Sequence, residues 1–81
     1  MTADDEAAAR IDQLLDELVA HQRKRVLAEA QRLNPRITAD DVLSPIDMPE
    51  LAADPAWNYE DGVLAGYLSA QMAIRAHFRR G

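Results

Sequence analysis

The fold of this chain is decided by residues 58–80, which read NYEDGVLAGYLSAQMAIRAHFRR. Large side chains recur there at spacings of three and four, which is typical of the buried face of an α-helix. These side chains are Leu64, Tyr67, Leu68, Gln71, Ile74 and Phe78. Asn58 favours a helix start, and arginines at the other end suit the negative end of the helix dipole. We therefore predict a long second helix over residues 58–80.

The other side of this helix carries small side chains instead of polar ones. It carries Gly62, Gly66, Ser69, Ala70 and Ala73. Two glycines inside a helix cost roughly 0.8–1 kcal/mol each relative to alanine, so helicity does not explain them. No charged residue lies between Asp61 and Arg75, which indicates a helix buried on more than one side. Small residues four apart let another backbone come close. We predict that this face packs either in a homodimer or under the middle segment of the same chain.

Residues 1–33 predict a first long helix. Thr2 or Asp4 can cap it, and the acidic residues that follow suit the positive end of its dipole. Apolar side chains form one stripe along it: Ile11, Leu14, Leu15, Leu18, Val19, Val26, Ala30 and Leu33. Gln22 lies in the middle of that stripe. The helix ends at Asn34, because the ring of Pro35 disfavours a helical conformation in the residue before it.

Residues 34–57 predict a connector with short helical turns. Thr38 can cap the first turn, and Pro49 can begin the second. From residue 37 to residue 74 the chain has seven acidic residues and no lysine or arginine. Four of these acids are explained as helix-start residues: Asp40, Asp41, Glu60 and Asp61. Asp47, Glu50 and Asp54 are not explained in this way.

The length and composition of the chain indicate one small all-α domain over residues 1–81. A chain of this length buries only about 60–65% of its unfolded surface, and it has no cysteine for a disulfide or a thiolate metal site. Pairing of two antiparallel hairpins into a four-helix homodimer would enlarge its core. A net charge of −5 disfavours nucleic acid, and no apolar run is long enough for a membrane span. The acidic start does not resemble a signal peptide, so a cytoplasmic location is expected.

The sequence shows no catalytic motif, and we predict neither a catalytic residue, a cofactor nor a metal site. His21 and His77 have no metal-ligand spacing, although antiparallel helices could bring them together. The acids of the connector do not follow the spacing of a calcium-binding loop. A ligand- or divalent-metal-responsive binding protein that uses these acids with the two histidines is the alternative reading.

Recognition of another protein is the leading hypothesis. Large side chains lie among acids in the connector, as aromatic anchors do within the polar rim of an interface. The predicted partner-binding residues are Asp47, Met48, Glu50, Leu51, Asp54, Trp57 and Tyr59. For Trp57, folding back as a lid over the helix pair is the preferred interpretation, and both roles can hold at once. We predict a non-enzymatic interaction module, an accessory or regulatory subunit, whose partner is a second copy of itself or a basic protein.

Overall fold

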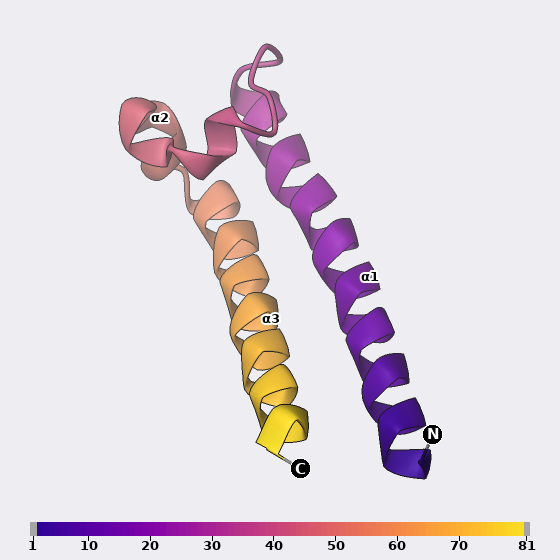
Figure 1. Cartoon of the computed structure of the whole chain (residues 1–81). Helices are drawn as coiled ribbons and strands as arrows, with labels where there is room; N and C mark the ends of the chain where they lie inside the picture. Colours follow the sequence, from indigo (N-terminus) through magenta and orange to yellow (C-terminus); the bar gives the residue numbers. More distant parts are fainter. Residues whose placement is uncertain (1, 81) are drawn as a thin grey trace.

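The computed structural model describes residues 2–80, except for the side chains of Ile46 and Arg80. Two long helices, α1 (Ala3–Leu33) and α3 (Pro55–Arg80), run antiparallel and pack against each other, which confirms the predicted all-α hairpin (Figure 1). The connector holds η1 (Asp41–Leu43), η2 (Pro45–Asp47) and α2 (Pro49–Ala52). It closes one end of the hairpin, and the start of α1 and the end of α3 lie at the other, open end. Within residues 2–80, none of the helices has an apolar stretch of the length that crossing a bilayer requires.

Capping side chains define the start of α1 and of the first connector turn, as predicted. The backbone N–H of Asp5 donates to Thr2 Oγ1 at 3.1 Å, and the Thr2 N–H donates to Asp5 Oδ2 at 3.2 Å. At the start of η1, the Asp41 N–H donates to Thr38 Oγ1 at 3.3 Å and the Thr38 N–H donates to Asp41 Oδ2 at 2.8 Å. Such pairs satisfy backbone donors that a helix start leaves without partners.

Helix α3 begins at Pro55, three residues before the predicted start at Asn58. Asp54 is the reason, because its Oδ2 accepts the backbone N–H of Trp57 at 2.8 Å. Proline suits the first helical position, where its missing N–H costs nothing. The sequence Asp54-Pro55 therefore starts a helix as well as ending the preceding turn. The Asn58 amide instead donates to the carbonyl oxygen of Ala52 at 2.9 Å.

The core lies at the closed end, where the connector covers the helix pair. Its buried apolar residues are Val19, Val26, Ala30, Ile37, Leu51, Trp57 and Leu64. Half-buried side chains pack around them: Leu27, Leu33, Val42, Met48, Tyr67 and Leu68. This core therefore combines residues from both long helices and from the connector.

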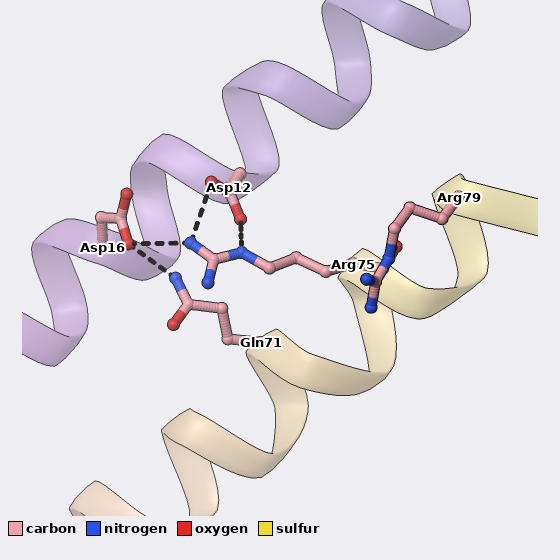
Figure 2. Close-up of polar contacts among 5 residues, drawn as sticks. All are labelled: Asp12, Asp16, Gln71, Arg75 and Arg79. Atoms are coloured by element: carbon pink, nitrogen blue, oxygen red, sulfur yellow. Dashed lines mark hydrogen bonds and ion pairs between the residues drawn. The ribbon is translucent and has the colours of Figure 1, made fainter.

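Toward the open end the two helices have no third element beside them, and their contacts become polar (Figure 2). Arg75 Nη2 lies 3.1 Å from Asp12 Oδ2 and 3.3 Å from Asp16 Oδ1. The Gln71 amide donates to Asp16 Oδ1 at 2.7 Å. The carboxylate of Asp12 has a lowered pKa because Arg75 donates to it. At the predicted cationic end of α3, Arg79 donates to the carbonyl oxygen of Arg75, whereas the Arg80 side chain lies outside the described residues.

Candidate interaction surface

The connector residues predicted to bind a partner lie in three different settings. Leu51 and Trp57 are core residues of the single chain, with 0% and 2% of their surface exposed. Met48 is half-buried against this core. Asp47, Glu50 and Tyr59 are exposed. The lid reading therefore describes Leu51 and Trp57, because their side chains fill the gap that two helices leave open at the closed end.

Asp54, the third acid among the predicted partner-binding residues, holds the connector to both helices. Besides accepting from Trp57, its Oδ2 lies 2.8 Å from Arg32 Nη2 of α1. Arg32 also contacts Glu29 one turn earlier at 2.8 Å. The pKa of Asp54 is lowered, first by the Trp57 N–H and then by Arg32, which outweigh its partial burial. Asp54 therefore has a structural role within the chain.

Glu60 is a buried link between the helices rather than a helix-start residue. Its carboxylate accepts from the Gln22 amide at 2.7 Å and from Arg25 Nε and Nη2 at 3.0 and 3.1 Å. The Gln22 amide also donates to the Glu60 carbonyl oxygen at 2.8 Å. Donation by Arg25, and then by Gln22, lowers the pKa of Glu60 although burial raises it. The sequence signal for this site was Gln22, a polar side chain inside the apolar stripe that needed a buried partner.

The small-residue face of α3 is exposed along its length. Gly62, Gly66, Ser69, Ala70 and Ala73 all face away from the core of the chain. A Cβ atom placed on either glycine would meet nothing within 4 Å. The connector therefore does not pack on this face, and within residues 2–80 no backbone approaches either glycine closely.

Replacement of Gly66 by alanine is expected to raise the free energy of unfolding by about 0.8–1 kcal/mol. Alanine loses less backbone entropy on helix formation, and its methyl group has room. Urea unfolding followed by circular dichroism measures the change. Ala65→Gly, at the exposed neighbouring position, is the matched control and should lower stability by a similar amount. Destabilisation by Gly66→Ala would show that the glycine face packs closely against another backbone.

An exposed apolar surface extends across one side of the hairpin. Leu14 and Leu18, assigned to the buried stripe of the first helix, are 52% and 45% exposed. One hollow is lined by Leu14, Glu17, Leu18 and His21. The next hollow is lined by His21, Gln22, Arg25, Tyr59, Glu60, Val63 and Tyr67. His21 belongs to both hollows, so they adjoin. We call the surface made by Leu14, Leu18, His21, Tyr59, Val63 and Tyr67 the apolar flank.

The ion pairs of the open half lie on the other side of α1. Asp12 and Asp16 are each two residues before a leucine of the apolar flank, which is about 200° around the helix axis at 3.6 residues per turn. Figure 2 shows both carboxylates with Arg75, which arrives from α3. One side of the open half is thus held by ion pairs, whereas the described residues form no ion pair on the apolar flank in that half.

The two histidines lie in separate settings. His21 lies in the apolar flank, whereas His77 lines a hollow at the open end with Thr2, Asp4 and Asp5. Its ring packs edge-on against Phe78, with centroids 5.4 Å apart. Across residues 2–80, no three His, Asp or Glu side chains are grouped as they would be to hold a metal ion. The geometry therefore gives the metal-responsive alternative no support.

No family model, no curated protein and no solved structure matches this chain.

Proposed function

We propose that this protein is a small non-enzymatic interaction module that binds a protein partner through the apolar flank. The observation that supports this proposal is the exposure of Leu14, Leu18 and Tyr59, the last of which is 70% exposed. A chain with a marginal core gains by burying apolar side chains, so large ones left exposed together indicate a binding surface.

The surroundings of the apolar flank fit a binding surface. Val63 and Tyr67 of the flank lie in the part of α3, between Asp61 and Arg75, that has no charged residue. The Arg25–Glu60 ion pair lines the same hollow, and its charges are already paired within the chain. Tyr59 is the one residue that this surface shares with the predicted connector surface. Tyrosine is enriched where interfaces concentrate binding energy. Asp47 and Glu50 are exposed in the connector, where their charges would attract a basic partner.

Leu18→Glu should abolish partner binding, whereas Met72→Glu should not. Glutamate at residue 18 places a charge in the apolar flank. Met72 is 64% exposed on α3 but lines a hollow beside Asp12, Arg75 and Arg79, away from the flank. Each purified chain is immobilised and exposed to an extract of the native cell, and the retained proteins are identified by mass spectrometry.

The expected result is a protein, including a second copy of this chain, that wild type and Met72→Glu retain and Leu18→Glu loses. Equal retention by all three chains would rule out the apolar flank as the binding surface. Circular dichroism first establishes that both variants keep their helix content. The accessory or regulatory role and the cytoplasmic location expected from the sequence remain predictions.

A further inference from the structure

We infer that the partner on the apolar flank is a second copy of this chain, packed antiparallel to the first through α1. The inference rests on the proposed function and names its partner. It follows from the seam that α1 presents on this side, which runs through Ala7, Ile11, Leu14, Leu18 and His21. These positions alternate in steps of four and three, the spacing by which helices pack side by side over several turns.

This side of the hairpin is long enough to seat a second copy. The molecule measures 48 × 18 × 18 Å. The α1 seam covers about 21 Å of the long side, at about 1.5 Å per residue. Two hairpins joined along this side form a four-helix bundle. Ile11 and Leu15, which the single chain leaves half-buried in the open half, then gain a second layer of helices.

Charge beside the seam selects the antiparallel arrangement. Arg10, Glu17 and Lys24 follow one another at seven-residue spacing along the edge of the seam. None of them forms an ion pair with another side chain that the structure describes. In an antiparallel pair, such positions on one helix face the same positions on the other. Glu17 of each copy then faces Arg10 of the second copy, and two-fold symmetry repeats the contact.

The same register brings the oppositely charged ends of the two α1 helices together. When residue 17 of one copy faces residue 10 of the other, residue 4 lies beside residue 23. The acidic first turn that contains Asp4 and Glu6 therefore meets Arg23 and Lys24 of the second copy. A parallel pair would instead place the two acidic first turns side by side, where like charges repel. In the antiparallel register Ile11 packs opposite Leu14, and Leu18 packs opposite Ala7.

Sedimentation equilibrium of the purified chain tests the inference. We expect a species of twice the 9.0 kDa chain mass that Met72→Glu retains and Leu18→Glu loses. Arg10→Glu or Glu17→Arg alone should raise the dimer dissociation constant about ten-fold, because each places like charges together twice. The double variant Arg10→Glu/Glu17→Arg should return it to within about three-fold of wild type. These two residues are exposed, so the charge exchange tests the register even if Leu18→Glu fails to fold.

A spin label at the exposed position 28 distinguishes the two orientations. With a rise of about 1.5 Å per residue, the antiparallel register separates the two labels by about 45 Å. A separation below about 20 Å would show a parallel dimer and overturn the inference. A 9.0 kDa species at every concentration would also overturn it. If the chain is a monomer but Leu18→Glu fails to retain a protein that wild type retains from the extract, the inference fails and the proposed function stands. If Leu18→Glu retains the same proteins as wild type, both fail.

Discussion

Trp57→Ala is expected to lower the free energy of unfolding by about 3–5 kcal/mol, enough to unfold much of the protein. Only 2% of the Trp57 surface is exposed, and the side chain belongs to the core that joins the two long helices and the connector. Alanine removes the largest side chain of that core and leaves a cavity. A domain of this size has a total stability near the low end of about 5–15 kcal/mol, so little remains after this loss.

Urea unfolding followed by circular dichroism measures the effect of Trp57→Ala at a fixed protein concentration, because any self-association adds to apparent stability. Leu43→Ala is the matched control. Leu43 also lies in the connector region but is 69% exposed, so its loss should change stability by less than about 0.5 kcal/mol. If Trp57→Ala is as harmless as Leu43→Ala, then Trp57 does not hold the lid in solution.

The all-α hairpin was predictable because periodicity and caps are local signals. Thr2 and Asn34-Pro35 mark the ends of α1, and the structure confirms both. The predicted start of α3 is three residues too late, because the pair Asp54-Pro55 ends one helix and also begins the next. Position 57 then changed from the last connector residue to a helical residue of the core. With 2% of its surface exposed, Trp57 fits the predicted lid and not an exposed binding residue.

The candidate site was less predictable because it depends on which neighbours a helix has. Leu14 and Leu18 continue the apolar stripe of α1, and the sequence alone cannot show that one neighbouring helix covers only part of so wide a stripe. The separation of acidic and basic residues along the sequence also depends on which elements become neighbours in the fold. Acids of the cation-free stretch meet arginines of α1 across the fold, as Glu60 meets Arg25 and Asp54 meets Arg32.

Glu60→Gln is expected to destabilise the protein at neutral pH and to remove part of its sensitivity to acid. Arg25 and Gln22 both donate to the Glu60 carboxylate, and these hydrogen bonds lower its pKa in the folded state. A group whose pKa is lowered by folding stabilises the protein when ionised. This contribution is complete above the ordinary glutamate value of 4.5 and is lost as the pH falls through the lowered folded-state pKa.

Thermal unfolding between pH 7 and pH 3 measures the effect as a difference between wild type and Glu60→Gln. At pH 7 the variant should unfold several degrees below wild type, and the two curves should converge as the pH falls below 4.5. Asp12 and Asp54 also have lowered pKa values, so both proteins lose stability in acid and only their difference reports on Glu60. Glu50→Gln is the control, because Glu50 is exposed and forms no hydrogen bond or ion pair with a described residue. A constant difference between wild type and Glu60→Gln at every pH would mean that the shape of Glu60, and not its charge, joins α1 to α3.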